Sequence, residues 1–367
     1  MKQKTMRAWA LREFGLSNLE MVETHRPIPS ATEVLIRVRT VSLNYRDKLV
    51  VDGALLPERP NMPFIPVSDF CGAVVDVGHN VSSVEPGDRV IGNFWTEWID
   101  GQPPRSMLTH GLSLGGPLPG GLAEYIVIPE AAAVKVPSDL TDAEASTLPV
   151  AALTAWFAFA ETGNVREGQT VLVQGTGGVA LAGLQIAQAI GARVIVTSRS
   201  ENKLIQTLKL GAWAGINTST HPNWAEEVMK LTDGAGVDHI LELIGGDNLT
   251  RSLTAAAPQG QISLVGFLGG MDAQISAIPF MLRRIRLQGV SVGHRRALER
   301  LISFVQRNDI HPVVDKEYAF EDVQDAFAHL KHGPFGKITV RVSDWREAKS
   351  QTLDEDVLLS QSALSEH

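Results

Sequence analysis

The feature that most constrains the fold is a glycine turn inside residues 171–181, VLVQGTGGVAL. The apolar run Val171–Val173 is typical of a buried strand, and Val179–Ile190 has helical spacing. A second apolar strand, Val194–Thr197, follows. A strand, a glycine turn, a helix and a strand within about 30 residues predict a dinucleotide-binding unit. The alternative is an ordinary turn that binds no ligand.

The small residues of this turn have separate expected roles. Gly175 permits the tight turn, Gly177 lets the backbone approach a pyrophosphate, and Ala180 lets the helix pack closely on the strand. The pyrophosphate would bind free N–H groups at the start of the helix. The predicted cofactor contacts of this turn are Gly175, Thr176, Gly177, Gly178, Val179 and Ala180.

Composition places the chain among globular proteins. Its 367 residues are 44% hydrophobic and 20% charged, which suggests two domains of ordinary size. The net charge of −8 argues against a nucleic-acid partner. The longest apolar run falls short of the roughly 20 residues that span a bilayer, and the basic N-terminus lacks the apolar core of a signal peptide. We therefore expect no membrane partner and a cytoplasmic location. The single cysteine, Cys71, excludes an intramolecular disulfide framework.

The pattern of strands and helices divides the chain. Residues 1–150 read as short strands between Gly and Pro turns, and residues 151–292 alternate strands with helices, which predicts a parallel sheet covered on both faces. A return segment follows at 293–343, with helices at Leu298–Arg307 and Glu321–His332 and a last strand at Lys337–Val342. The polar segment 344–367 is expected to be a flexible tail. The predicted fold class is α/β: a β-rich domain plus a doubly wound parallel sheet.

Several stretches together resemble the medium-chain dehydrogenase/reductase superfamily. They are Asn44–Asp47 (NYRD), Pro66–Gly72 (PVSDFCG), Pro86–Val90 (PGDRV), Leu122–Tyr125 (LAEY), Thr154–Trp156 (TAW) and the glycine turn. The resemblance covers roughly residues 6–343. It implies a GroES-like catalytic domain, to which the C-terminal segment returns, beside a Rossmann domain. Substrate and nicotinamide are then expected to meet between the two domains.

The residues at the metal positions of this family depart from its zinc enzymes. Where those enzymes place Cys, His and Cys, the alignment gives Asn44, Ser68 and Val150. None of these is a good zinc ligand. Residues 93–121, which would carry a four-cysteine zinc lobe, contain no cysteine. Asp47 and Asp69, with His79 and His110 nearby in sequence, are more typical of a solvated face than of a metal site. The chain thus resembles the zinc-independent branch, with quinone oxidoreductases and enone reductases, and we expect no metal.

The residues after the second strand indicate NADP(H) as the cofactor. Arg199 stands where an NAD enzyme would place a carboxylate for the ribose, and Ser198 and Lys203 can add hydrogen bonds or charge to a phosphate. The alternative is a basic surface patch. Glu201 is the contrary charge. Gly266 and Phe267, after a later strand, are further expected cofactor contacts, and Thr154 matches a family threonine near the nicotinamide.

The candidate catalytic residues are Asn44 and Tyr45, which the resemblance places at the floor of the substrate site. The Asn44 amide donates without titrating, and the Tyr45 phenol can give a proton to an enolate or phenolate. The alternative for Tyr45 is a place in the β-domain core with its hydroxyl capped. His294 and Arg295 could line the pocket, although a histidine there is more often a surface residue. The tryptophans of segment 94–104 either roof the substrate site or hold their loop to the domain.

These observations predict an NADPH-dependent, zinc-independent oxidoreductase that transfers hydride to a quinone or an α,β-unsaturated carbonyl. A conjugated acceptor suits a site without a metal, because its negative charge spreads into an enolate or aromatic ring. A metal-free alcohol or ketone oxidoreductase is one alternative, and an NADP(H)-binding sensor or structural protein with little turnover is another. The expected partners are a small carbonyl or quinone substrate and a second copy of the chain. The strand at Leu287–Val292 would pair in that homodimer.

Overall fold

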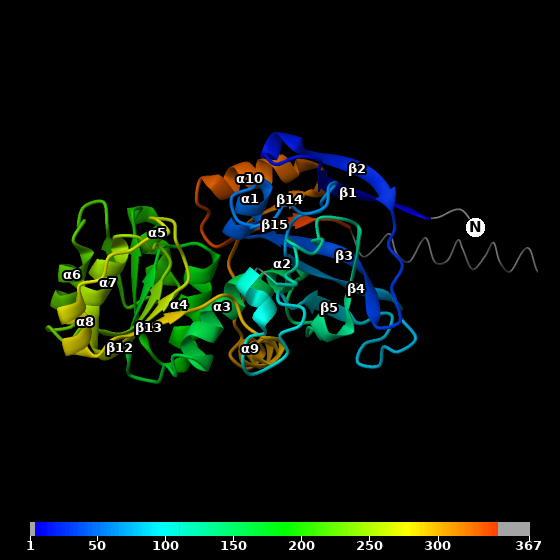
Figure 1. Ribbon diagram of the computed structural model, residues 1–367. Helices are drawn as coiled ribbons and strands as arrows, with labels where there is room; N and C mark the ends of the chain where they lie inside the picture. The colour runs from blue at the N-terminus through cyan, green and yellow to red at the C-terminus, as the bar shows by residue number, and fades with distance from the viewer. Residues whose placement is uncertain (1–3, 110, 344–367) are drawn as a thin grey trace, which may run out of the picture.

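The computed structural model describes residues 4–109 and 111–343, so the predicted tail at 344–367 lies outside the described residues. Two large sheets lie toward opposite ends of the molecule, and the helices α2, α3 and α9 lie between them (Figure 1). One sheet has six strands and the other seven. The model thus has the predicted α/β class, with a GroES-like β-rich domain and a Rossmann-like parallel sheet. The domain boundaries at 150 and 292 stay predictions. Among the described residues, no helix is long and apolar enough to cross a membrane.

The six-stranded sheet is parallel throughout and has the order β10-β9-β8-β11-β12-β13. Its strands are β8 (Thr170–Gln174), β9 (Arg193–Ser198), β10 (Ala214–Asn217), β11 (Val237–Glu242), β12 (Ala256–Leu264) and β13 (Arg286–Gly289). The order reverses between β8 and β11, which is where a doubly wound sheet binds ligands at the carboxyl ends of its strands.

Alternate strand residues face opposite helix layers. Leu172, Ile195 and Ile240 lie side by side across three strands and pack with α6 and α7 on one face. Val171 and Val173 face the other way, toward α4 and α3. The helices of this region are α3 (Leu153–Trp156), α4 (Gly178–Ile190), α5 (Glu201–Lys209), α6 (Trp224–Leu231), α7 (Asn248–Ala255) and α8 (Ala277–Arg283). Both faces of the sheet are therefore covered, as its apolar strands require.

The seven-stranded sheet has the order β14-β15-β3-β4-β5-β7, with β6 also paired to β3. Its strands are β3 (Glu33–Leu43), β4 (Asp69–Val77), β5 (Arg89–Gly92), β6 (Tyr125–Pro129), β7 (Ala133–Lys135), β14 (Val314–Ala319) and β15 (Lys337–Arg341); a separate hairpin joins β1 (Thr5–Leu11) and β2 (Leu19–His25). The short helices are α1 (Tyr45–Val51) and α2 (Asp142–Ser146), and the return segment carries α9 (Arg295–Arg307) and α10 (Val323–Lys331).

The C-terminal return completes the seven-stranded sheet. β15 lies between β14 and β3, and Ile338 pairs with Leu43 in antiparallel register. The predicted last strand is confirmed by this pairing. The predicted strand at Leu287–Val292 is wrong at its end: β13 stops at Gly289, and Val292 has a left-handed φ of 60°, outside the extended region.

Candidate functional site

The glycine turn leaves open space where a ligand could bind. Gly175 has a φ of 84°, and its N–H donates to the Thr197 carbonyl at 2.8 Å. A Cβ added at Gly175 or Gly177 would meet no atom within 4 Å. Gly177 is the N-cap of α4, and no side chain caps this helix. Free N–H groups and an unfilled backbone cradle fit the pyrophosphate of a dinucleotide.

Gly178 is a glycine for a different reason. A Cβ there would lie 2.3 Å from Cδ of Lys337. The turn is also held to the segment before β15, because Gly177 forms an isolated bridge with Gly336 and the Gly336 N–H donates to the Thr176 carbonyl at 2.9 Å. The start of α4 therefore packs against the C-terminal return of the chain.

The next two residues of α4, Val179 and Ala180, place their side chains at least partly in the protein interior. Ala180 is buried, as the packing role requires, and Val179 is half-buried. Gly183 lets α4 pack closely on the sheet, because a Cβ there would lie 2.8 Å from Cδ2 of Leu241. Sequence reasoning overlooked Gly183, although a small residue five positions after Gly178 is a visible signal.

The end of β9 presents Arg199 to solvent. Ser198 accepts a hydrogen bond from the Ser200 N–H at 3.2 Å, and Ser200 caps α5. Glu201 accepts from the Asn217 amide at 2.9 Å, which holds this contrary carboxylate at the neighbouring strand. The Lys203 ammonium donates to the Gly333 carbonyl, so it must give up or share this bond to contact a cofactor phosphate.

Gly266 is explained by the packing of two loops. A Cβ there would lie 2.0 Å from the Leu243 carbonyl oxygen, so the loops after β11 and β12 touch through their backbones. Phe267 beside it is 37% exposed. Cofactor contacts by Gly266 and Phe267 stay predictions, and the structure supplies a packing reason for the glycine.

A buried carboxylate holds the loop after β11 in place. Glu242 accepts hydrogen bonds from the Gln174 amide at 2.9 Å and the Gly245 N–H at 2.9 Å, and also from Asn248 and Ser252. Gln174 is the last residue of β8 and Glu242 the last of β11, so the cluster lies at the reversal point of the sheet. Sequence reasoning missed it, although two polar residues that end apolar strands are a detectable signal.

Asn44 and Tyr45 lie where α1 begins. The Asn44 N–H donates to the Asp47 carboxylate at 2.8 Å, and the Asn44 side chain caps the helix in return. The Asn44 amide nitrogen donates to Oδ2 of Asp69 at 2.8 Å. Tyr45 is 45% exposed, and its hydroxyl has no hydrogen-bond partner in the described part of the chain. The alternative that Tyr45 packs in the core is therefore wrong, because the first turn of α1 turns the ring outward.

A buried lysine connects Asn44 to the glycine turn, and sequence reasoning missed it. Lys337 donates to the Leu43 carbonyl at 2.7 Å and to Oδ1 of Asn44 at 2.5 Å, and lies 3.8 Å from the Asp69 carboxylate. Burial raises the pKa of Asp69 to about 7, against the opposing effect of the Lys337 ammonium. Burial likewise lowers the pKa of Lys337. Lys337 and Asn44 are 293 positions apart, so no local pattern indicates this contact.

The positions expected for a metal are engaged in other ways. Ser68 is buried, and its N–H and hydroxyl donate to the Asp47 carboxylate at 3.0 and 2.9 Å. The expectation that Asp47 and Asp69 lie on a solvated face is wrong, because both carboxylates are fully buried. Asp47 also pairs with Arg46, with 3.3 Å between guanidinium nitrogen and oxygen. An amide, a hydroxyl and Val150 do not fit zinc. Across residues 4–109 and 111–343, no three His, Cys, Asp or Glu side chains gather as metal ligands; His110 lies outside these residues.

Thr154, His294 and the tryptophans of segment 94–104 each form hydrogen bonds within the protein. Thr154 donates its hydroxyl to the Val150 carbonyl at 2.6 Å and is buried, so its place near a nicotinamide stays a prediction. His294 is a buried N-cap that accepts from the Ala297 N–H at 3.0 Å, so it is not a surface residue, and its place in a substrate pocket stays a prediction. Trp95 and Trp98 are buried and donate to the carbonyls of Ser291 and Gly101, which favours the role of holding the loop.

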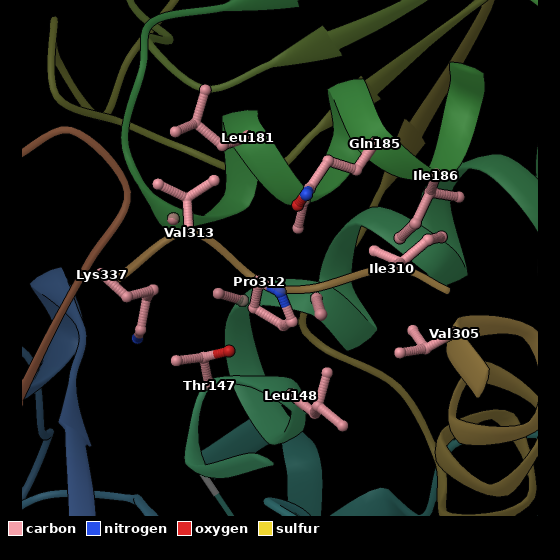
Figure 2. A pocket seen from close by; sticks show the side chains of 14 residues that line it. Thr147, Leu148, Leu181, Gln185, Ile186, Val305, Ile310, Pro312, Val313 and Lys337 are labelled. Carbon is pink, nitrogen blue, oxygen red and sulfur yellow. The ribbon is translucent and has the colours of Figure 1, made fainter. Parts of the chain in front are cut away.

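A small cavity lies beside α4 and ends at Lys337 (Figure 2). Its volume of about 20 Å³ is enough for about one water molecule. Leu181, Gln185 and Ile186 of α4 line one side, and Thr147 and Leu148 line another. The cavity is too small for a nucleotide, and it borders the glycine turn only at Gly178. It is therefore a small packing cavity next to the glycine turn and not the cofactor site.

Comparisons with known proteins agree with this geometry. Residues 30–138 match the alcohol dehydrogenase GroES-like domain, and residues 178–307 match the zinc-binding dehydrogenase family. A zinc-type alcohol dehydrogenase-like protein of Schizosaccharomyces pombe is 37% identical over 84% of this chain and 91% of the relative. A quinone oxidoreductase-like protein 2 homologue of Nematostella vectensis is 30% identical over 84% and 81%.

The crystal structure of a protein from Sinorhizobium meliloti 1021 that is described as a putative alcohol dehydrogenase superposes with a TM-score of 0.88 and 47% identity, covering 93% of this chain and 100% of that one. Oxidoreductases of this kind act with a nicotinamide cofactor, and the open glycine turn fits one. The chain is therefore an oxidoreductase that belongs to the medium-chain dehydrogenase/reductase superfamily.

Proposed function

We propose that this protein is a zinc-independent, NADPH-dependent reductase of quinones or α,β-unsaturated carbonyls. The observation that carries the proposal is the engagement of Asn44 and Ser68 in hydrogen bonds to protein groups. Asn44 is held by Lys337 and Asp69, and Ser68 by Asp47. Neither residue offers a thiolate or imidazole to zinc.

The residues of the site suit reduction without a metal. When bound, the nicotinamide would supply hydride to an electrophilic carbon. The protein must then stabilise a growing oxyanion, and one well-placed donor lowers such a barrier by about 3 kcal/mol. Asn44 can donate an amide hydrogen, and Tyr45 is exposed with a free hydroxyl that can give up a proton. A conjugated acceptor spreads its charge, so two neutral donors suffice.

The preference for NADPH is supported by Arg199. It lies directly after β9 and is exposed, while Glu201 is held by Asn217. A guanidinium can bind the 2′-phosphate through paired hydrogen bonds. Arg199→Asp should raise the Kd for NADPH about tenfold or more and leave the Kd for NADH within threefold, measured by titration of nicotinamide fluorescence. Equal changes in both constants would remove the NADPH assignment.

The reaction itself is tested by NADPH oxidation with matched acceptors. Quinones, enones and saturated ketones are compared at equal concentration, and the metal content of the active protein is measured in parallel. Turnover of quinones or enones is expected. Turnover of saturated ketones alone would favour the metal-free alcohol or ketone oxidoreductase, and tight NADPH binding without turnover would favour a sensor or structural protein. Stoichiometric zinc that a chelator removes together with activity would overturn the proposal.

We also propose a homodimer through the edge of the parallel sheet. β13 is the last strand of that sheet, and α8, the helix that precedes it in the chain, contains no buried residue. Ile278, Met281 and Leu282 are all more than 60% exposed. An open strand edge with apolar neighbours is a surface that soluble proteins normally cover. Sedimentation should show a dimer that Leu282→Glu dissociates; a monomer at micromolar concentration would contradict the proposal.

A further inference from the structure

The proposed function leaves one buried charged side chain without a task. Lys337 is 5% exposed and donates to Leu43 and Asn44 in the interior, next to Asp69. Burying an ammonium is costly unless its contacts are well made. A less costly solution for a strand residue at this position would be an apolar side chain. The retained charge therefore needs a reason in the site itself.

The contacts of Lys337 decide which way the Asn44 amide faces. A lysine ammonium only donates hydrogen bonds, so the Asn44 atom 2.5 Å from it must be the amide oxygen. The amide nitrogen then faces Asp69, to which it donates at 2.8 Å. One amide hydrogen is used by this bond. The second has no partner among residues 4–109 and 111–343, and it is the hydrogen that a substrate oxygen can accept.

A turned amide would work against the reaction. If Asn44 rotated by half a turn, its carbonyl oxygen would replace the N–H₂ group and repel a developing oxyanion. Asp69, which accepts from the amide nitrogen, already opposes the turned orientation. The ammonium adds a second contact that only the donating orientation can make, because it donates to the amide oxygen.

The stem of Lys337 also touches the cofactor turn. A Cβ added at Gly178 would lie 2.3 Å from Cδ of Lys337, while Nζ of Lys337 donates to Asn44. One side chain thus spans from the first residue of α4 to the candidate catalytic amide. Figure 2 shows Lys337 at the end of the cavity behind the turn.

We propose that Lys337 is a positioning residue for hydride transfer: it holds the Asn44 amide with its N–H toward the substrate oxygen and links that amide to the glycine turn. The inference rests on the proposed function and adds a residue to it. Lys337 acts through Asn44 and does not itself touch the substrate.

The test avoids leaving Asp69 as an unpaired buried charge. The reference is Asp69→Asn, and Lys337→Met is added to it, so both members of the buried pair become neutral. The kcat should fall about 10-fold or more against the best acceptor, while KM and the Kd for NADPH change less than threefold. An unchanged kcat would overturn the positioning role. Normal kcat in the double variant, with loss only in Lys337→Met alone, would mean that Lys337 merely neutralises Asp69.

A double-mutant cycle then asks whether Lys337 acts through Asn44. In the Asp69→Asn background, Asn44→Ala should lower kcat by about 10²-fold, which is the effect of losing one oxyanion donor. Adding Lys337→Met should then lower kcat less than twofold further. Effects that multiply would show an independent role and overturn the inference.

The same cycle is measured in urea unfolding, which needs no turnover. Lys337 and Asn44 should be coupled in the free energy of unfolding, because they share a buried hydrogen bond. If the unmutated protein reduces no acceptor, the proposed function fails while this coupling still tests the contact. Absence of coupling in unfolding would reject the arrangement from which Lys337 is inferred.

Discussion

The turn at Gly175–Gly177 and the loops around Gly245 and Gly266 look alike in the sequence, since each is a glycine-rich end of a parallel strand. Their surroundings differ. A Cβ at Gly175 or Gly177 would meet no protein atom within 4 Å, whereas at Gly266 it would lie 2.0 Å from a carbonyl oxygen and at Gly245 2.6 Å from another. Glycine indicates a ligand only where the protein leaves the space empty.

Both regions lie at the carboxyl ends of strands in the parallel sheet, where a dinucleotide is expected to bind. In the first region the backbone is available to a cofactor. In the second it is used by another loop, which Glu242 also holds. Substitution by alanine separates these two classes, because stability should report packing and cofactor affinity should report open space.

The largest effect is expected at Gly266. Gly266→Ala forces a methyl group against the Leu243 backbone, and we expect a loss of about 3 kcal/mol or more in the free energy of unfolding, as for severe overpacking. Urea unfolding followed by far-UV circular dichroism measures it. A variant as stable as the unmutated protein would place Gly266 in the class of open glycines.

Gly163 is also a glycine that leaves no space for a Cβ, and its neighbour is the titratable side chain of His239. A Cβ there would lie 2.8 Å from Cε1 of His239, whose pKa burial lowers to about 4. In the unfolded chain His239 binds a proton near pH 6.5, whereas in the folded protein it does so only near pH 4. The free energy of unfolding is therefore largest above pH 6.5 and falls by roughly 3 kcal/mol as the pH drops toward 4. His239→Gln should flatten this loss.

The control for that prediction is the exposed His311. Glu144 raises the pKa of His311, so its stabilisation exists at low pH and is lost as the pH rises. His311→Gln should therefore leave the acid loss of stability in place. An acid loss that persists unchanged in His239→Gln would refute the assignment to His239.

Gly178 lies between the two classes, because its neighbour is the stem of a side chain. Gly178→Ala must displace Cδ of Lys337, and we expect a cost of about 2 kcal/mol in unfolding with a lower kcat. Equilibrium unfolding and steady-state NADPH oxidation measure the two effects. Unchanged stability and kcat together would show that Lys337 can move freely, which would also weaken its proposed role.

Gly177 should behave in the opposite way. Its φ of −82° suits alanine, and no protein atom opposes a Cβ, so Gly177→Ala should change the free energy of unfolding by less than about 0.5 kcal/mol. The Kd for NADPH should rise about tenfold, or about 1.4 kcal/mol. Calorimetric titration checks this; equal NADPH affinity would mean that the cofactor does not approach Gly177.

The smallest effect separates backbone strain from packing. Gly168 has a φ of 82° and open space around it, and it precedes β8, at the opposite end of that strand from the glycine turn. Gly168→Ala should cost about 1 kcal/mol in unfolding through its left-handed backbone alone, and NADPH affinity should not change. A much larger cost would contradict this assignment, because a Cβ at Gly168 would meet no protein atom within 4 Å.

Local patterns predicted most of the parallel sheet. The apolar runs Val171–Val173 and Val194–Thr197 identified β8 and β9, and Arg199 was placed directly after the second of them. β10 was missed because its four residues, Ala214–Asn217, include a glycine and an asparagine. α1 was also missed, although Asn44 and Asp47 form a capping box at its start.

The candidate site was predictable only in part. The glycine turn follows from a short stretch of sequence, and Asn44 and Tyr45 follow from the family resemblance. The contacts of Lys337 and Asp69 with Asn44 depend on β15 and β4 flanking β3, and pairing between distant strands leaves no local signal. The role of Gly266 depends equally on a neighbouring loop. Sequence thus indicated which residues to consider, and tertiary packing decides what each one does.

The place of β15 has a consequence for synthesis on the ribosome. Strands β8–β13 come from one continuous stretch and can pair as soon as that stretch has emerged. β3, made much earlier, lacks its partner along Thr40–Leu43 until the last described strand has been translated. An early strand is therefore completed only at the end of translation, and until then its unpaired edge can pair with other chains.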